Sequence, residues 1–211
     1  MQEGSQKLLG YFLVVSRLST CVILDWMYVL VDRLSYELEN QIILDETEDR
    51  NEYIKAGVSI DIDFTFDSEI PFYTEIPVYA NYNERNLLTS ISVEVDLWVP
   101  RVEITDEQEP IVQKKDSGLL KTTTELNRNL IGSLTATGDA ILICDMDMIH
   151  LCHDCATYNG ESQIIAPPEG EDKGFHAGVV FEIESDREFP VYGEYEGDSL
   201  KRITIEIANS N

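Results

Sequence analysis

The chain has 211 residues, and its hydrophobic content of 43% is enough for packed cores in one large or two small domains. Its 40 Asp and Glu residues outnumber 15 Lys and Arg, which gives a formal net charge of -25. Nucleic-acid binding needs clustered Lys and Arg, so this balance argues against it and predicts a basic protein or a cation as partner. The alternative is that the acidity serves only solubility.

The N-terminal part predicts neither export nor a membrane span. Its first residues lack the charged and apolar regions of a signal peptide. The apolar run from Tyr11 to Val31 is interrupted by Arg17 and Asp25, each of which costs about 2.5 to 3.5 kcal/mol near a bilayer centre. We therefore expect two adjacent buried strands there. The four cysteines are unevenly spread, which predicts a cytoplasmic protein with reduced thiols and no membrane partner.

One hairpin pattern occurs twice. Residues 76–82, Ile-Pro-Val-Tyr-Ala-Asn-Tyr, and residues 91–95 match residues 189–195, Phe-Pro-Val-Tyr-Gly-Glu-Tyr, and residues 203–207. Other landmarks recur in the same order at nearly the same spacing: Asp25 with Asp145, Gln41-Ile42-Ile43 with Gln163-Ile164-Ile165, and Ala56-Gly57-Val58 with Ala177-Gly178-Val179. Such ordered recurrence predicts an internal repeat.

The predicted fold is mainly β, with two tandem copies of a small antiparallel β-rich module packed with pseudo-two-fold symmetry. Copy one spans residues 1–99, with an insertion near residues 60–75, and copy two spans residues 130–211. Residues 100–129 read as a linker that can include one short helix before Gly132. This organisation predicts either a monomer with pseudo-dimeric halves or a homo-oligomer.

Each copy opens with a strand, Tyr11 to Ser16 or Ser133 to Thr137, and a second apolar strand ends at Asp25 or Asp145. Next, residues 35–44 form one helical or strand segment in copy one, whereas residues 159–170 form a loop in copy two.

The third strand and the closing hairpin complete each copy. Period-two alternation of Ile60, Ile62, Phe64 and Phe66 against Asp61, Asp63 and Asp67 predicts a strand with one buried and one anionic face. Copy two repeats the pattern over residues 179–184, and the hairpins of residues 76–95 and 189–207 follow. Antiparallel sheets with one solvated face are the expected result.

The hairpins resemble a loosely defined group of bacterial and phage domains of unknown function. The matching segments are Phe189 to Tyr192, Ile203 to Ile207 and Asp145, with weaker counterparts at Ile76 to Tyr79, Ile91 to Val95 and Asp25. The resemblance implies small β-rich modules, some of them used in immunity or phage–host conflict, and no catalytic activity.

A cysteine- and histidine-rich segment lies in copy two. Cys152 and Cys155 have the two-residue spacing that lets two thiolates share a tetrahedral zinc ion. The further candidate ligands are Cys144, His150, His153 and His176. The alternatives are buried, inert thiols, or a redox-active pair of cysteines without the usual βαβ surroundings.

Acidic and tyrosine side chains supply the other candidates. Asp25 and Asp145 end equivalent strands, where an aspartate can bind a metal, act as a base or cap nearby backbone N–H groups. Asp147 extends the second of these sites toward a divalent cation. Each hairpin also carries a Tyr-x-x-Tyr pair, of which at most one member belongs to the core, so Tyr82 and Tyr195 are candidates for partner contact, together with the exposed Asp61 and Asp63.

The sequence contains no glycine-rich phosphate loop, nucleophile elbow or His-Glu-x-x-His motif, so a common hydrolase or NTPase is not expected. The leading hypothesis is a non-catalytic acidic binding or inhibitory protein, of immunity or phage anti-defence type, that engages a basic partner. One alternative is a zinc-containing domain or metal-dependent enzyme centred on copy two. Another is a protein that sequesters a small ligand, such as a nucleotide, in a cleft between the copies.

Overall fold

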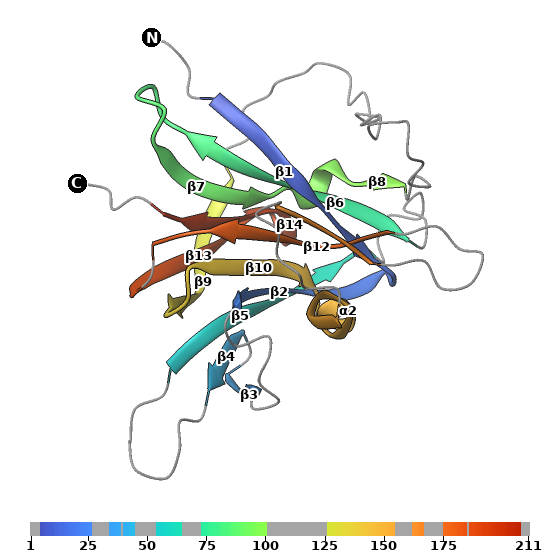
Figure 1. Cartoon of the computed structure of the whole chain (residues 1–211). Coiled ribbons are helices and arrows are strands. Elements are labelled where there is room, and N and C mark those ends of the chain that lie inside the picture. Colours follow the sequence, from blue (N-terminus) through green and yellow to red (C-terminus); the bar gives the residue numbers. More distant parts are fainter. Residues whose placement is uncertain are drawn as a thin grey trace.

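The computed structural model describes residues 5–26, 34–38, 40–44, 54–64, 73–100, 126–154, 162–166, 175–184 and 186–207. These residues form two antiparallel β-sheets that pack face to face, with one short α-helix on the outside (Figure 1). The prediction of a mainly β, antiparallel fold is confirmed.

Sheet A carries both Pro-Val-Tyr hairpins. Its strand order is β1-β6-β7-β14-β13-β9, and the short β8 also pairs with β6. The strands are β1 (Ser5–Val14), β6 (Thr74–Tyr82), β7 (Leu88–Val93), β8 (Val99–Pro100), β9 (Asn127–Ala136), β13 (Arg187–Glu196) and β14 (Ser199–Glu206).

Sheet B carries the two strands that end at Asp25 and Asp145. Its order is β11-β12-β10-β2-β5-β4-β3. The strands are β2 (Leu18–Asp25), β3 (Leu34–Leu38), β4 (Gln41–Leu44), β5 (Ile54–Asp63), β10 (Ala140–Asp145), β11 (Gln163–Ala166) and β12 (Phe175–Glu182). Two 3₁₀ turns, η1 (Val95–Leu97) and η2 (Met146–Met148), and the helix α2 (Ile149–Asp154) complete the described elements.

Each sheet has the same order of equivalent strands whether it is read from one edge or from the other, if strands are matched by the repeated landmarks. Sheet A runs β1-β6-β7 and then the counterparts β14-β13-β9, while sheet B runs β4-β5-β2 and then β10-β12-β11, with β3 as an addition. The two halves therefore do not form separate sandwiches; they join through β7 and β14 in sheet A and through β2 and β10 in sheet B. A two-fold relation between the halves requires this symmetric order of equivalent strands. The tandem duplication itself stays a prediction.

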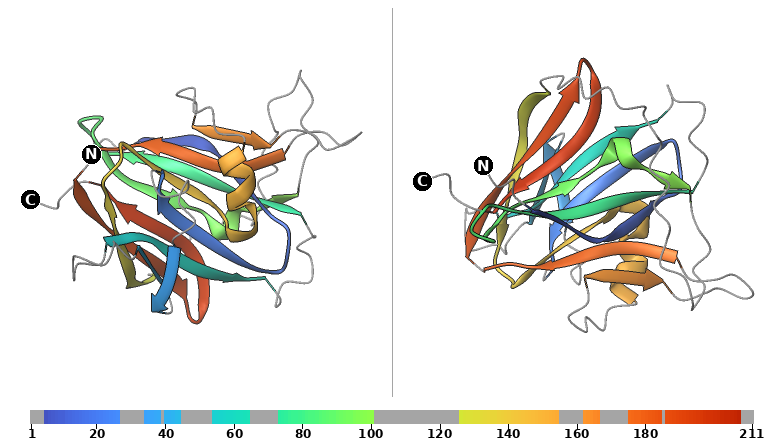
Figure 2. Two further views of the ribbon diagram at one scale, coloured as in Figure 1. Left: turned by 60° about the horizontal axis from the view of Figure 1, so that its bottom comes forward. Right: turned by 90° about the horizontal axis from the view of Figure 1, so that it is seen from above.

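The main core lies between the sheets. Alternate residues of each strand point inward, so apolar side chains on the sheet B side such as Ile23 and Phe64 meet side chains of sheet A such as Phe12, Ile203 and Phe189 across the sandwich. The turned views in Figure 2 show the two sheets as layers of the sandwich. Each fully buried side chain of this size contributes about 1.5 to 3 kcal/mol, so this inter-sheet core dominates the stability.

Sheet B also buries part of its outer face, which corrects the expectation of one solvated face per sheet. Val22, Leu142, Cys144 and Val180 form a second core there with Cys152 of α2. The middle strands β2 and β10 are consequently apolar at successive positions, as strands covered on both faces are. The solvated face is the outer face of sheet A.

The described part of the segment before Gly132, from Asn127 onward, belongs to strand β9, and a short helix elsewhere in the linker stays a prediction. Two other local predictions were wrong. Residues 35–44 contain two paired strands, β3 and β4, in place of a single segment. The predicted loop at residues 159–170 contains β11, because Gln163–Ala166 pair with β12. The linker residues 101–125 and the insertion residues 65–72, including Phe66 and Asp67, lie outside the described residues.

Two glutamines join the sheets at β-bulges. Strand β1 bulges between Leu8 and Gly10, and strand β9 bulges at the equivalent place before Gly132. Gln163 Oε1 accepts from Tyr11 N at 2.6 Å, and Gln163 Nε2 donates to Tyr11 O at 2.8 Å. A bulge leaves main-chain groups outside the ladder, and the side-chain amide satisfies them.

Candidate functional site

A pocket of about 550 Å³ lies between the sheets where β5 ends, beside η1 and the turn that joins β13 to β14. We call it the inter-sheet pocket. Its walls come from both halves of the chain, residues 61–64 and 95–98 from the first and residues 195–201 from the second. Its volume falls within the range of about 300 to 1,000 Å³ that is common for ligand sites.

Acidic residues surround an apolar interior in this pocket. Four exposed aspartates line it: Asp61, Asp63, Asp96 and Asp198. The apolar part comes from the ends of the main core, chiefly Ile62, Phe64 and Val95 together with Trp98, Tyr195 and Leu200. Exposed carboxylates beside apolar surface favour a ligand with a cationic head and an apolar stem, such as a lysine or arginine side chain.

Lys201 shows how the pocket holds a cation. Its Nζ lies 3.0 Å from Asp96 Oδ1 and 3.8 Å from Glu196 Oε2, and its side chain is 23% exposed. Lys201 is the one Lys or Arg among the described residues that line the pocket, so aspartates outnumber basic side chains in this lining by four to one. One Asp61 oxygen also accepts the Thr20 hydroxyl at 2.8 Å, which orients that carboxylate.

Gly193 leaves space for Tyr195. A Cβ atom at Gly193 would lie 2.6 Å from the Tyr195 ring and 2.8 Å from Ile131, closer than real Cβ atoms approach other groups. Burial raises the pKa of Tyr195, so the phenol is neutral at physiological pH. Three of the predicted partner residues, Asp61, Asp63 and Tyr195, thus meet in one pocket.

The predicted zinc ligands whose side chains the structure describes, Cys144, His150, Cys152 and His176, do not converge on one point. Cys144 and Cys152 are both buried on the outer side of sheet B, where their thiols share a hydrogen bond. His176 belongs to a different polar contact between the sheets, and His150 is exposed on α2. Within the described ranges no group of three or more His, Cys, Asp or Glu residues can hold a metal ion. Cys155 and the side chain of His153 lie outside the described residues.

The three thiols that the structure describes, those of Cys21, Cys144 and Cys152, are buried. Burial, and then the hydrogen bond with Cys152, which favours the protonated form of Cys144, raise the pKa of Cys144 well above its usual value. Burial also raises the pKa of Cys21, on the opposite side of sheet B. A protonated thiol is a poor nucleophile and a poor metal ligand, so these cysteines fit the alternative of inert core thiols.

Asp25 and Asp145 hold backbone turns. Asp25 Oδ2 accepts from Thr137 N at 2.6 Å, from the Thr137 hydroxyl at 3.0 Å and from Gly138 N at 3.1 Å. Asp145 caps η2 by accepting from the N–H of the exposed Asp147 at 2.9 Å. Chiefly because of burial, the pKa of Asp145 is raised. Both aspartates therefore act as caps, the structural alternative for these positions.

None of the four hairpin tyrosines is fully buried, which agrees with the expectation of at most one core tyrosine in each pair. Tyr79, Tyr82, Tyr192 and Tyr195 are all half-buried. A register shift follows Asn81 in one hairpin and Glu194 in the other, and such bulges disturb the simple alternation of a strand. Tyr82 lies away from the inter-sheet pocket.

A buried polar contact links the two halves near β1. His176 Nδ1 lies 2.9 Å from Glu75 Oε1, and the Tyr11 ring stacks on the His176 ring with centroids 5.5 Å apart. At the equivalent place in the other half, Lys55 Nζ lies 2.8 Å from Glu188 Oε1. The His176–Glu75 contact is buried, whereas the equivalent Lys55–Glu188 pair is exposed to solvent.

Sequence reasoning missed a second hollow, on the outer face of sheet A. Two arginines and three glutamates meet there from strands far apart in the sequence: Arg128, Arg202, Glu94, Glu194 and Glu206. Arg128 fell within the predicted linker. The internal repeat nevertheless relates these positions to the first half. Arg128 is the strand partner of Glu194 just as Gln6 is the strand partner of Asn81.

Comparison of the chain with models of protein families, with curated proteins and with solved structures finds no match. The resemblance based on the Pro-Val-Tyr hairpins therefore stays a prediction. Among the residues that the structure describes, no helix is long and apolar enough to cross a membrane.

Proposed function

We propose that the protein is a non-catalytic binding protein that engages a basic partner through the inter-sheet pocket. The observation that carries the proposal is the pocket itself, in which four exposed aspartates line an apolar interior and an internal lysine is already held by Asp96. A lysine or arginine of the partner would place its cationic head among the carboxylates and its stem against Phe64, Trp98 and Leu200.

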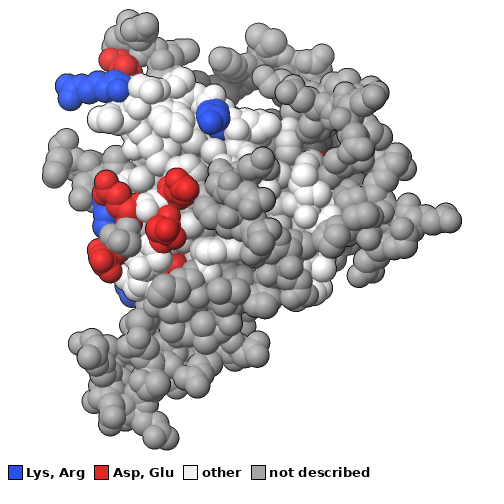
Figure 3. Space-filling model, in the orientation of Figure 1, with Lys and Arg blue, Asp and Glu red and all other residues white. Residues whose placement is uncertain are grey.

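The net charge of -25 supports the same partner class. A strongly negative field accelerates the approach of a positively charged protein and weakens as salt screens it. Most of the Asp and Glu side chains visible in Figure 3 gather together on one side of the described surface, whereas Lys and Arg are scattered. Inhibition of a basic effector, the role implied by the resemblance to immunity-type domains, is the biological setting that this proposal fits.

Titration of the protein with a deca-lysine peptide tests the proposal. The triple variant Asp61→Asn, Asp63→Asn, Asp198→Asn should bind about tenfold more weakly, because three exposed ion pairs contribute about 0.5 kcal/mol each. A matched triple variant removes the same charge from exposed sites outside the pocket: Glu84→Gln, Asp139→Asn and Asp186→Asn. It should bind much as the unmodified protein does.

Two further measurements sharpen the test. Affinity should fall as salt increases from low to physiological ionic strength. A peptide with two phenylalanines among its lysines should bind more tightly than deca-lysine, since it also fills the apolar interior. Equal losses in the two triple variants would show that deca-lysine senses only net charge, and the pocket would then have no special role.

A further inference from the structure

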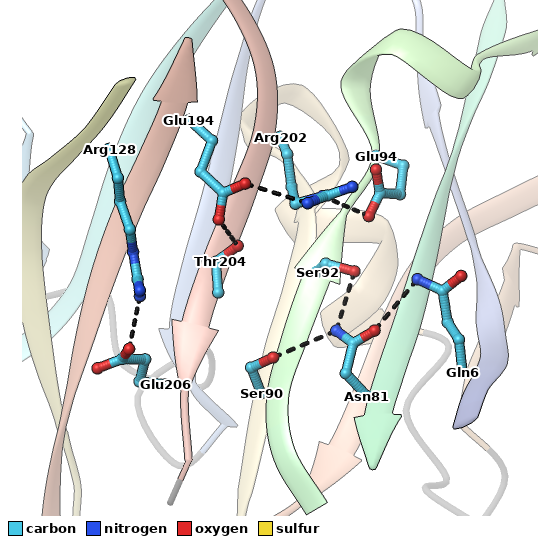
Figure 4. A network of polar contacts seen from close by, with 10 residues as sticks. All are labelled: Gln6, Asn81, Ser90, Ser92, Glu94, Arg128, Glu194, Arg202, Thr204 and Glu206. Atoms are coloured by element: carbon cyan, nitrogen blue, oxygen red, sulfur yellow. Dashed lines mark hydrogen bonds and ion pairs between the residues drawn. The ribbon is translucent and has the colours of Figure 1, made fainter. Parts of the chain in front are cut away.

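The hollow on the outer face of sheet A is a groove of about 510 Å³ that crosses all six strands of the main path. We call it the sheet-A groove. It is centred where β7 of the first half pairs with β14 of the second half. Figure 4 shows ten side chains on the face that borders it, linked into a network. The inter-sheet pocket shares no lining residue with this groove.

The groove has a buried polar floor. Ser92 is 2% exposed, Glu94 5% and Thr204 7%. Polar side chains at such depth are costly unless they form hydrogen bonds. Thr204 donates to Glu194 at 2.8 Å, and Asn81 donates to Ser92 at 3.1 Å, so the floor is preorganised before any ligand arrives.

The charges of the groove are already paired with one another. Arg202 donates to Glu94 at 2.7 Å and to Glu194 at 3.1 Å, and Arg128 donates to Glu206 at 2.7 Å. Burial by itself would lower the pKa of Arg202, but the two glutamates outweigh it and the pKa is raised. An anionic ligand would have to displace glutamates and a cationic ligand would have to displace arginines, so neither matches the groove as built.

The uncharged groups of the groove offer both donors and acceptors. Gln6 donates to Asn81 at 3.1 Å, and Asn81 donates to Ser90 at 3.2 Å as well as to Ser92 (Figure 4). Within this network the hydroxyl hydrogens of Ser90 and Ser92 and the carbonyl of Gln6 form no hydrogen bond. A ligand hydroxyl donates one hydrogen bond and accepts two, so it can bond to such mixed groups without bringing charge.

The two halves of the groove differ in chemistry. Equivalent positions hold Gln6 and Arg128, and likewise Asn81 and Glu194, as their strand registers show. Arg128 also lies over the Tyr192 ring, 3.8 Å from its centroid, which fixes the guanidinium as a flat donor surface. A groove with a neutral end at β1 and β6 and a charged end at β9 and β13 binds an elongated ligand in a single direction.

From this geometry we propose that the sheet-A groove binds an uncharged polyhydroxylated ligand, an oligosaccharide. Hydroxyl groups of one sugar unit would bond to Ser90, Ser92 and Gln6, and those of the next would bond to Arg128 and the free oxygens of the glutamates. The ligand supplies only hydroxyl groups, so the internal ion pairs stay intact when it binds. This site does not depend on the basic partner proposed for the inter-sheet pocket.

Calorimetric titration with four neutral oligosaccharides, cellohexaose, maltohexaose, mannohexaose and chitohexaose, tests this proposal. At least one should bind with a Kd below about 10 mM. Ser92→Ala and Arg128→Gln should each weaken that binding at least fivefold. Asp61→Asn in the inter-sheet pocket should leave it unchanged, and it serves as the control.

The far-ultraviolet circular dichroism spectrum of each variant confirms that it is folded. Failure of all four sugars to bind the folded protein would overturn the proposal, as would binding that both groove variants retain in full. Parallel titrations with inorganic phosphate and with deca-lysine decide the ligand class. If binding of either charged probe is lost in Ser92→Ala and Arg128→Gln but not in Asp61→Asn, the groove is a charged-ligand site and the oligosaccharide assignment is wrong.

Discussion

Gln41 and Gln163 occupy equivalent positions in the two halves, and each forms hydrogen bonds with the main chain of the opposite half. Gln41 Nε2 donates to Ser133 O at 2.6 Å, whereas Gln163 Nε2 donates to Tyr11 O at 2.8 Å. Each amide also donates to the strand beside its own, Gln41 to Gly57 O and Gln163 to Gly178 O. These two side chains therefore fasten sheet B to sheet A and the first half to the second.

Replacement of either glutamine should destabilise the whole sandwich. Gln163→Ala removes the acceptor of Tyr11 N and the donor to Tyr11 O, so two main-chain groups lose their partners. We expect the free energy of unfolding to fall by about 2 to 4 kcal/mol, because an unsatisfied buried polar group costs about 1 to 3 kcal/mol. Urea unfolding measures it, and Gln41→Ala should give a similar value. A loss below about 0.5 kcal/mol in both variants would contradict the assignment.

Gly10→Ala tests the contact between Gln163 and strand β1 through a change in β1. A Cβ atom at Gly10 would collide with the carboxamide of Gln163. The substitution should therefore cost more in the unmodified protein than in the Gln163→Ala background, where the space is free. Strictly additive losses would show that the two residues do not meet.

The buried His176–Glu75 contact and the exposed Lys55–Glu188 pair form a natural matched experiment. His176→Ala leaves the fully buried Glu75 carboxylate without its one side-chain hydrogen-bond partner among the described residues, and we expect a loss of about 3 to 5 kcal/mol. Lys55→Ala should cost less than about 1 kcal/mol, because both members of its pair are about half exposed.

A double variant separates lost pairing from lost packing. In His176→Leu, Glu75→Leu neither residue needs a polar partner, so much of the stability should return. Equal losses in His176→Ala and Lys55→Ala, measured by urea unfolding at neutral pH, would contradict the difference in burial.

Tyr11 should make the protein sensitive to alkali. Burial, and then the charges of Tyr79 and Glu75, raise the pKa of Tyr11 to about 12, whereas an unfolded tyrosine titrates near 10. The stabilisation is fully present below pH 10 and is lost as the pH rises through the folded value, because the unfolded chain ionises first. The decrease should be on the order of 2 kcal/mol between pH 10 and 12.

Tyr11→Phe should remove this part of the alkaline loss. Among the described residues the Tyr11 hydroxyl has no hydrogen-bond partner, so the substitution should change stability little at neutral pH. Urea unfolding at several pH values, with phenolate absorbance as a direct readout, measures both effects. An unchanged alkaline profile in Tyr11→Phe would assign the sensitivity to other groups.

The equivalent aspartates should respond differently to amidation. Asp25→Asn weakens three hydrogen bonds to the turn at residues 137–138 and should cost about 1 to 3 kcal/mol at neutral pH. Asp145 has one oxygen without a partner among the described residues, and its pKa is raised mainly by burial. Its ionised form is therefore the destabilising one, and its contribution declines as the pH rises through the folded pKa.

Asp145→Asn should accordingly be more stable relative to the unmodified protein at pH 7 than at pH 4. Asparagine keeps an oxygen to accept from Asp147 N, so the cap of η2 survives. Urea unfolding at both pH values gives the comparison. A greater relative gain at pH 4 would reverse the sign of the argument.

Local patterns predicted much of the strand content. The alternation around Ile60, Ile62 and Phe64 predicted a strand with a buried face, and these three side chains are buried while Asp61 and Asp63 are exposed. Such patterns succeed because successive side chains of a strand point to opposite faces, whatever the partner strand is. They failed at β11, where Gln163–Ala166 is short and followed by prolines, and its pairing with β12 decides its structure.

The described members of the predicted zinc site do not come together, for a reason of the same kind. Closeness in sequence suggested that Cys144, Cys152 and His176 converge, but the cysteines lie in the core outside sheet B while His176 lies against Glu75 between the sheets. A sheet separates residues whose side chains leave opposite faces, and strand parity could not be assigned before the register was known.

The sequence by itself determined the acidic charge, the repeated landmarks and the in-and-out alternation of the longer strands, because these depend on composition and on the period of a single strand. Only the tertiary structure decided which strands are neighbours. It thereby brought the turn at residues 195–201 to the end of β5, Arg128 to the face of sheet A and each bridging glutamine to the opposite half. Such contacts join residues about 90 to 150 positions apart, and pairing over such distances is selected by the packing of the whole sandwich.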